Sequence, residues 1–233
     1  MQRYFLNEKL TVISDENAFH IHKVMRMKPN EKIEVCVNNT CYLAEIKSVG
    51  ETVLIDYLTE LPSTRSKVKI TLIQGLGKQD KQEIVSKYAT EFGVSEIIFV
   101  PMKRSIVQYD DKVLDKKMER FQKIALEAAR LSHRDDVPNL RYERDLTKLS
   151  FSQKHKWIAY ENNKNESFFQ IVSEVETLDE VVILVGPEGG IDEQEIAYLC
   201  AHGFKTVGLG KRILQTEIAS LYALSVLDAY MES

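Results

Sequence analysis

A short glycine-rich turn near the C-terminal end has the arrangement of a ligand-binding loop. The apolar run Val181–Val185 leads directly into the turn 186–190 (GPEGG), after which Asp192 and Glu195 have the spacing of a helix capping box. Open α/β sheets bind ligands where a strand ends in such a turn. The spacing does not match the dinucleotide or P-loop patterns, and the acidic residue in the turn would repel phosphate. The turn therefore predicts a site for a neutral or cationic ligand, with a purely structural tight turn as the alternative.

A second glycine turn, 208–214, also follows a predicted strand and precedes a helix, which Thr216 could cap. Two such turns near one end of the chain can form one pocket. Leu209, Ile213 and Leu214 would supply apolar walls around a flat ring, while backbone groups read the edge of that ring. We therefore expect the two turns to share one ligand.

The elements that must position these turns alternate between strands and helices from residue 68 onward. Such alternation predicts a mostly parallel sheet that is covered by helices on both faces, an α/β fold. We expect strands at 68–73, 96–100, 157–160, 181–185 and 205–208, and helices at 79–92, 111–131, 166–175, 192–201 and up to residue 230.

The first 60 residues are typical of a different unit, a small β-barrel. Polar and apolar residues alternate over 32–37 and again over 41–49, with a turn between them, which predicts a hairpin. Further strands are expected at 3–6 and 52–58, and a helix that Asp15 caps is expected to run to Met25. The segment 61–67 has the composition of a linker, so we expect one domain over 1–67 and a second over 68–233.

The last helix is apolar on almost every side, from Ile218 to Ala229. A surface helix shows a single apolar stripe, so this one is expected to be buried on nearly all sides. The terminal helix of a small domain rarely achieves that within one chain. A subunit interface, and therefore a homodimer, is expected here.

Composition excludes several classes of protein. The chain has 233 residues, of which 44% are hydrophobic and 28% charged, and a net charge of −4, which is typical of a globular protein. No apolar run approaches the roughly 20 residues of a membrane span, and the N-terminus does not resemble a signal peptide. Three cysteines without a C-x-x-C pair predict neither a disulfide nor a metal site, so a cytoplasmic location is expected.

Charge is distributed unevenly along the chain. Residues 101–156 carry 14 basic and 9 acidic side chains, whereas 157–233 carry 4 and 13. A basic segment in an acidic protein indicates a surface that faces a polyanion, with solvated helix faces as the alternative.

These residues resemble a known family over nearly the full length of the chain. The C-terminal half resembles the SPOUT methyltransferases, and the whole chain resembles the RsmE type, which methylates N3 of a uridine in 16S ribosomal RNA of the small subunit. The matching segments occur in order and are Arg3-Tyr4-Phe5, 20–26 (HIHKVMR), 91–94 (EFGV), Lys103-Arg104-Ser105, Glu127-Ala128-Ala129, Arg134 with Val137-Pro138, 186–190 (GPEGG), Leu209-Gly210, and 213–217 (ILQTE).

The resemblance implies a PUA-like β-barrel that helps to hold RNA, followed by a SPOUT α/β domain whose C-terminal part forms a trefoil knot. It implies S-adenosyl-L-methionine as the cofactor, a homodimer, and ribosomal RNA or the assembled small subunit as the partner, with no metal and no membrane. The cofactor-binding residues expected on this basis are Leu184, Gly186, Pro187, Glu188, Gly189, Gly190, Leu209, Gly210, Ile213, Leu214 and Gln215. The expected RNA-binding residues are Arg3, His20, Lys23, Arg26, Lys103, Arg104 and Arg134.

Methyl transfer to N3 requires loss of the ring proton, and a guanidinium near O2 or O4 would favour the ring anion. Arg134 and Arg104 are the candidates for this role, with plain phosphate contacts as the alternative. Glu217 is a candidate base, although a carboxylate at a helix start also interacts with the helix dipole. Gln215 stands where the family usually has arginine, and Leu131 where it usually has glutamine.

Three other functions remain open from the sequence. The chain could be an RNA- or ribosome-binding protein that keeps the fold without activity, or it could methylate a different nucleotide. It could also be an unrelated doubly wound enzyme that acts on a small metabolite.

Overall fold

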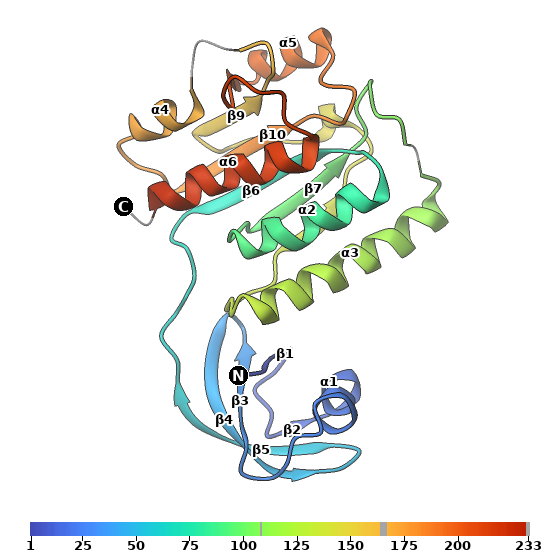
Figure 1. The fold of residues 1–233 in the computed structure, drawn as a ribbon, viewed down its shortest axis with the longest axis vertical. Coiled ribbons are helices and arrows are strands. Elements are labelled where there is room, and N and C mark those ends of the chain that lie inside the picture. Colours follow the sequence, from blue (N-terminus) through green and yellow to red (C-terminus); the bar gives the residue numbers. More distant parts are fainter. Residues whose placement is uncertain (108, 164–166, 232–233) are drawn as a thin grey trace. The chain divides into compact units, whose positions relative to one another are not determined.

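The protein consists of two compact units in a computed structural model that describes residues 1–107, 109–163 and 167–231 (Figure 1). The first unit comprises Met1–Arg65 together with Ala129–Asp136, and the second comprises Ser66–Ala128 and Val137–Ser233. The sequence predicted a single domain boundary after residue 67. It did not predict that the segment Ala129–Asp136 belongs to the first unit.

The first unit is built on a curled sheet, a half-barrel with the strand order β1-β3-β4-β5-β2. Its strands are β1 (Arg3–Leu6), β2 (Val12–Ile13), β3 (Lys32–Val37), β4 (Thr40–Val49) and β5 (Val53–Glu60). Alternate residues of these strands, among them Ile33, Val35 and Ile46, are fully buried and form the core of the unit.

The hairpin predicted from the alternating pattern is confirmed. β3 and β4 pair in antiparallel register from Lys32↔Glu45 to Val37↔Thr40, and Asn38 and Asn39 form the turn with positive φ angles of 49° and 65°. Asparagine tolerates this conformation, which matches the twist of a two-residue hairpin. Cys36 and Cys41 lie directly opposite each other and form a disulfide. The expectation of no disulfide is wrong because it considered only spacing, whereas the hairpin register brings the two sulfur atoms together.

The helix of the first unit differs from its prediction. α1 (Asp15–Phe19) is followed by a single π-helical turn, η1 (His20–Val24), so the segment is helical as far as predicted but changes its hydrogen-bond pattern midway. Ser14 occupies the N-cap position, and Asp15 is the first helical residue.

The second unit contains a six-stranded sheet of order β11-β9-β10-β6-β7-β8, in which neighbouring strands are parallel. The strands are β6 (Lys69–Gly75), β7 (Glu96–Val100), β8 (Asn139–Tyr142), β9 (His155–Ala159), β10 (Glu180–Val185) and β11 (Lys205–Val207). Strand β8 was not predicted, because its four residues (NLRY) carry no apolar run.

Helices cover both faces of this sheet, as the α/β prediction required (Figure 1). Val181 and Ile183 of β10 pack with α2, α3, α4 and α6 on one face, while Val182 and Leu184 pack with α5 on the other. The helices are α2 (Gln79–Glu91), α3 (Asp111–Leu131), α4 (Phe168–Ser173), α5 (Glu193–Ala201) and α6 (Thr216–Met231), with a short 3-10 turn, η2 (Leu146–Lys148). The predicted start of the helix at Glu166 lies outside the described residues.

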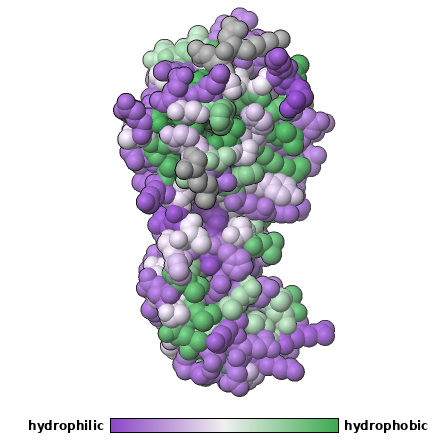
Figure 2. Space-filling view, turned by 60° about the vertical axis from the view of Figure 1, so that its left-hand side comes forward, coloured by the Kyte–Doolittle hydropathy of each residue, from purple (hydrophilic) through white to green (hydrophobic). Residues whose placement is uncertain are grey.

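The last helix, α6, is only partly buried within one chain. Ala223, Leu224 and Leu227 are fully buried, whereas Ile218 and Tyr222 are 45% and 38% exposed. Burial on nearly all sides is therefore not achieved in the single chain. Hydrophobic residues are interspersed with hydrophilic ones on the face of the molecule that Figure 2 presents. Among the described residues, no helix is both long and apolar enough to cross a membrane.

Candidate functional site

A cavity of the second unit lies where three neighbouring parallel strands end. It has a volume of about 590 Å³ and is lined by three loops, 159–162 after β9, 185–191 after β10 and 209–216 after β11, together with Lys81 and Ala219. Because these strands are adjacent in the sheet and run in the same direction, their following loops meet at one edge. The two turns predicted to share a ligand therefore do line one cavity.

The first turn, 186–190, has the local structure that its sequence predicts. The amide of Gly190 donates to the carbonyl oxygen of Pro187 at 2.9 Å, and Gly190 has a φ of +75°. α5 then begins with the predicted capping box, in which the Asp192 side chain caps the helix and Glu195 bonds back to the Asp192 amide. The end of the turn is thus fixed by the start of the helix.

Glycine is required in this turn because other groups approach its backbone closely. A Cβ at Gly189 would lie 2.7 Å from the carbonyl oxygen of Arg104, a backbone atom, and Gly190 has a positive φ that other residues rarely adopt. Separations below 3.0 Å are not found between real atoms of this kind. The wall of the cavity is therefore bare backbone, which suits a ligand read by amide and carbonyl groups.

Glu188 lines the cavity, but its carboxylate also joins the turn to α2. Oε1 of Glu188 accepts a hydrogen bond from the amide of Lys78, the N-cap residue of α2, at 3.1 Å. Gly77 makes room for this carboxylate, since a Cβ there would lie 2.4 Å from Oε2. Oε2 is buried and has no hydrogen-bond partner among the residues that the structure describes. The carboxylate stabilises the start of a helix, where negative charge is favoured.

The second turn supplies the other predicted lining residues, including Leu209, Gly210, Leu214 and Gln215. Gly210 has a φ of +101°, and Ile213 is 89% exposed at the cavity. These positions agree with the apolar walls expected from the sequence.

Leu184 is the exception among the predicted lining residues. It is fully buried in the core on the α5 side of the sheet and is not among the residues that line the cavity, so its role in cofactor binding stays a prediction. Alternation along β10 directs Leu184 into the core, and the next residue, Val185, lines the cavity instead.

The sequence missed the third loop, 159–162, which contains Glu161 and Asn162. It has no glycine and no recognisable motif. The only available signal was its place directly after a predicted strand.

An ion pair stands beside the cavity where α2 and α6 begin. Nζ of Lys81 lies 2.9 Å from Oε2 of Glu217, and both side chains are mostly buried. Glu217, the candidate base, thus already accepts a hydrogen bond from a cation. This contact favours the structural alternative for Glu217 that the sequence left open.

Arg104 and Lys103 lie on the loop that follows β7, next to the first turn. The backbone of Arg104 contacts Gly189, and its guanidinium lies 4.0 Å from Asp192, while Lys103 bonds Asp192 at 3.1 Å. The hydrogen bonds from Lys103 and from the Gln194 amide hold the pKa of Asp192 below its ordinary value of 3.8. Both cations are about half exposed, so they remain accessible to a polyanion.

Arg134 belongs to the first unit, whereas the cavity belongs to the second. Its guanidinium bonds Oδ1 of Asp136 through Nη2 at 2.8 Å and through Nε at 3.2 Å, and its side chain is 11% exposed. Joint action of Arg134 and Arg104 on one substrate stays a prediction.

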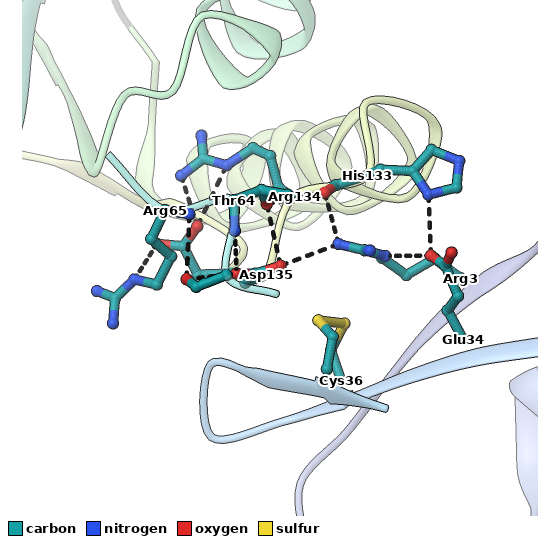
Figure 3. A network of polar contacts seen from close by, with 11 residues as sticks. Arg3, Glu34, Cys36, Thr64, Arg65, His133, Arg134 and Asp135 are labelled. Carbon is teal, nitrogen blue, oxygen red and sulfur yellow. Dashed lines mark hydrogen bonds and ion pairs between the residues drawn. A yellow bond between two sulfur atoms is a disulfide. The ribbon is translucent and has the colours of Figure 1, made fainter. Parts of the chain in front are cut away.

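Arg3 is not at the surface. It lies within a polar network of the first unit, 4% exposed, with Nε 2.8 Å from Glu34 and Nη1 3.2 Å from Asp135 (Figure 3). The expectation of an exposed RNA contact is wrong for this residue. A buried guanidinium must be paired, and here two carboxylates from distant parts of the sequence neutralise it.

The other candidates on the first unit lie near the π-helical turn. His20 is partly buried, and its Nδ1 lies 3.0 Å from the hydroxyl of Tyr4, whereas Lys23 and Arg26 are exposed. The two exposed cations are therefore the predicted RNA-binding residues of this unit that a phosphate can reach.

Comparison with known proteins identifies both units. The RNA methyltransferase domain model matches residues 64–228, and the RNA methyltransferase PUA domain model matches residues 13–55. The first unit is therefore the PUA-like domain and the second the SPOUT-type α/β domain that the sequence predicted. The trefoil threading of the C-terminal segment stays a prediction.

Relatives match over almost the whole chain. Ribosomal RNA small subunit methyltransferase E from Bacillus subtilis is 35% identical over 254 aligned residues, which cover 100% of this chain and 98% of the relative. The crystal structure of the Neisseria gonorrhoeae protein of the same name, bound to S-adenosyl methionine, is 29% identical, with a TM-score of 0.86 and coverage of 98% and 97%.

A Legionella pneumophila protein whose structure holds the cofactor SAM has a TM-score of 0.88, 27% identity, and coverage of 97% and 96%. The chain thus belongs to the ribosomal RNA small subunit methyltransferase E family.

Proposed function

We propose that this protein transfers the methyl group of S-adenosyl-L-methionine to N3 of a uridine in 16S ribosomal RNA. The observation that carries the proposal is the cavity at the ends of β9, β10 and β11, whose wall at 186–190 is bare backbone. Family membership supports the reaction class.

The residues present fit the cofactor. A volume of about 590 Å³ is within the range of small-molecule sites, and Leu209, Leu214 and Ala219 offer apolar surface to a purine ring. The cofactor supplies a methyl group that its sulfonium charge already activates, so the protein chiefly has to align donor and acceptor.

Alignment alone does not remove the N3 proton. Arg104 is the cation that lies against the first turn, and a guanidinium placed near O2 or O4 stabilises the uridine anion. Arg134 is the second candidate for this role. Glu217 is less suited to accept the proton, because Lys81 already holds its carboxylate.

RNA binding is assigned to the exposed cations. Lys23 and Arg26 on the first unit and Lys103 and Arg104 on the second are accessible to phosphates, so binding is expected to weaken as salt rises. A ribosomal RNA substrate implies a cytoplasmic location. The exposed apolar residues of α6, Ile218 and Tyr222, are proposed to lie in a homodimer interface.

The test is incubation of the protein with labelled S-adenosyl-L-methionine and small-subunit RNA, free or assembled, that lacks the modification. Label on N3 of one uridine supports the proposal. Binding of S-adenosylhomocysteine without transfer to RNA would instead support the non-catalytic alternative, and label elsewhere would support a different target nucleotide.

The roles of the arginines are tested by Arg104→Ala and Arg134→Ala. A catalytic role predicts a fall in the saturated rate of about 100-fold or more, as for other groups that stabilise developing charge. Weaker RNA binding with an unchanged saturated rate would show that both residues are phosphate contacts.

A further inference from the structure

A buried chain of hydrogen bonds connects two of the loops that form the cavity. Its members, which we call the Gln74 relay, are the side chains of Ser220, Gln74 and Thr216 and the carbonyl group of Gly186. Gln74 stands near the end of β6, Thr216 and Ser220 are one turn apart in α6, and Gly186 opens the turn after β10. Gln74 and Ser220 are fully buried, and Thr216 is nearly so.

The bonds of Gln74 and Thr216 in the relay have defined directions, whereas the hydroxyl of Ser220 has two acceptors, Oε1 of Gln74 and the carbonyl oxygen of Thr216 at 3.1 Å. Nε2 of Gln74 donates to Oγ1 of Thr216 at 2.8 Å and to the carbonyl oxygen of Gly75 at 3.3 Å, and its Oε1 accepts from the hydroxyl of Ser220. A hydroxyl has one hydrogen. Because Thr216 accepts from Gln74, its own hydrogen is directed to the carbonyl oxygen of Gly186.

The relay ends at the carbonyl group of Gly186, a residue that lines the cavity. The peptide that joins Gly186 to Pro187 has no N–H, so its carbonyl is the only group by which hydrogen bonding can orient it. Gly186, Pro187 and Thr216 all line the cavity, whereas Gln74 is fully buried and cannot touch a ligand there. The relay thus contacts the wall of the cavity from the protein interior, on the side away from a bound ligand.

We propose that Gln74 is a positioning residue for the methyl-donor site. Through Thr216 it orients the Gly186 carbonyl and keeps the turn at 186–190 in register with the start of α6. This inference rests on the proposed function, because the ligand concerned is the methyl donor. The relay contains no charged group, so it fixes the backbone without adding a charge beside a charged ligand.

The decisive variants lie outside the cavity. Gln74→Met keeps the approximate volume but removes the amide that donates to Thr216, so the Thr216 hydroxyl and the Gly186 carbonyl lose the group that fixes their orientation. We expect the Kd for S-adenosylhomocysteine, measured by calorimetry, to rise about tenfold or more. Ser220→Ala removes the outermost bond of the relay together with the bond from the same hydroxyl to the carbonyl oxygen of Thr216, and we expect a rise of about threefold.

A second pair of variants, at Thr216, tests the relay without measuring catalysis. Thr216→Val removes the hydroxyl at nearly constant shape and should raise the Kd about tenfold, whereas Thr216→Ser keeps the hydroxyl and should restore binding to about twofold of wild type. Hydrogen exchange at the Gly190 amide, which closes the turn, should accelerate in Gln74→Met and Thr216→Val.

Two residues of α2 provide matched controls. Ser86 and Thr90 are fully buried, and each hydroxyl donates at 2.7 Å to the carbonyl oxygen four residues earlier, as happens within many helices. Ser86→Ala and Thr90→Val are therefore expected to shift the thermal midpoint of the ligand-free protein but to leave the Kd within about twofold. These controls distinguish the effect of removing any buried hydroxyl from the effect of breaking the relay.

The outcomes distinguish the two proposals. Relay variants that bind S-adenosylhomocysteine as tightly as the α2 controls would overturn the relay and leave the proposed function intact. Tight binding by the wild type, with graded loss in the relay variants but no methyl transfer to RNA, would support the relay and overturn the proposed function. A wild-type protein that does not bind S-adenosylhomocysteine would overturn both.

Discussion

Two polar networks fix loops in this protein. One is built around charged side chains, and the other contains no charged group. In the first unit, Arg3, Glu34, Ser63, Thr64, His133 and Asp135 form a network of charged groups, which we call the linker cluster (Figure 3). In the second unit, the Gln74 relay joins three side chains and a carbonyl group without any charge.

The linker cluster can use charges because each buried charge in it is paired. Asp135 is buried and accepts from Ser63, from the Thr64 amide and from the buried Arg3, whereas the side chain of His133 is 43% exposed. The relay has no charged partner to offer, and an unpaired charge buried there would be far more costly than an unpaired amide. The comparison teaches that buried charges are used where opposite charges lie beside them. It predicts that the cluster responds to pH and that the relay does not.

The largest effect is expected from Gly75→Ala in the second unit. A Cβ at Gly75 would lie 2.4 Å from the backbone nitrogen of Pro187 and 2.7 Å from the carbonyl carbon of Gly186, and backbone atoms cannot rotate away. We expect a loss of about 3 kcal/mol or more in the free energy of unfolding, measured in urea, with weaker binding of S-adenosylhomocysteine.

Gly50→Ala is the control for this change, because the nearest atom to its Cβ would be 3.6 Å away. Its effect should stay within about 0.5 kcal/mol. Wild-type stability and binding in Gly75→Ala would show that the turn moves freely over β6, and the relay would then have nothing rigid to position.

A smaller effect is expected from Asp135→Asn in the linker cluster. The change removes the charge that faces Arg3 and places an amide where the carboxylate accepts from Ser63 at 2.8 Å and from the Thr64 amide at 2.7 Å. Hydrogen bonds to charged groups contribute more than neutral ones, so we expect a loss of about 2 kcal/mol in urea unfolding.

Calorimetry on Asp135→Asn should show unchanged binding of S-adenosylhomocysteine, since the cavity belongs to the other unit. The opposite pattern, weak binding with full stability, would contradict the division of roles between the two networks.

The sequence predicted those parts of the molecule that depend on near neighbours. The alternating pattern located β3 and β4, and the Asp192–Glu195 spacing located the start of α5, because both signals span a few residues. The cavity could be anticipated because glycine turns follow β10 and β11, and parallel neighbouring strands bring such turns to one edge.

The parts that failed depend on residues far apart in the chain. Gln74 and Thr216 are separated by 142 positions, and Arg3 and Asp135 by 132, so no local pattern shows that they meet. Arg3 was expected to contact RNA because the sequence does not show which carboxylates pair with it. Leu184 was expected in the site from the family resemblance alone, whereas alternation along β10 directs its side chain into the core.

Acid sensitivity provides the finest test of the comparison. Burial alone raises the pKa of Glu34, but hydrogen bonds from Arg3 and His133 outweigh it and leave that pKa below its ordinary value of 4.5. Burial likewise raises the pKa of Asp135, and the bonds from Ser63, Thr64 and Arg3 reverse this and leave it below 3.8. A carboxyl group with a lowered pKa in the folded protein takes up its proton first in the unfolded chain. It therefore contributes stability above its unfolded pKa, and that stability is lost as the pH falls through the folded value.

We therefore expect the free energy of unfolding in urea to decrease as the pH is lowered from about 5 toward 3.5, the range in which the unfolded carboxyl groups take up protons. Glu34→Gln and Asp135→Asn should each show a shallower decrease than the wild type, because each lacks one of the responsible groups. Ser220→Ala, in the uncharged relay, should keep the wild-type slope at a lower overall stability. If all four proteins lost stability in parallel, the charges of the linker cluster would not be what holds its loops, and the two networks would differ in composition alone.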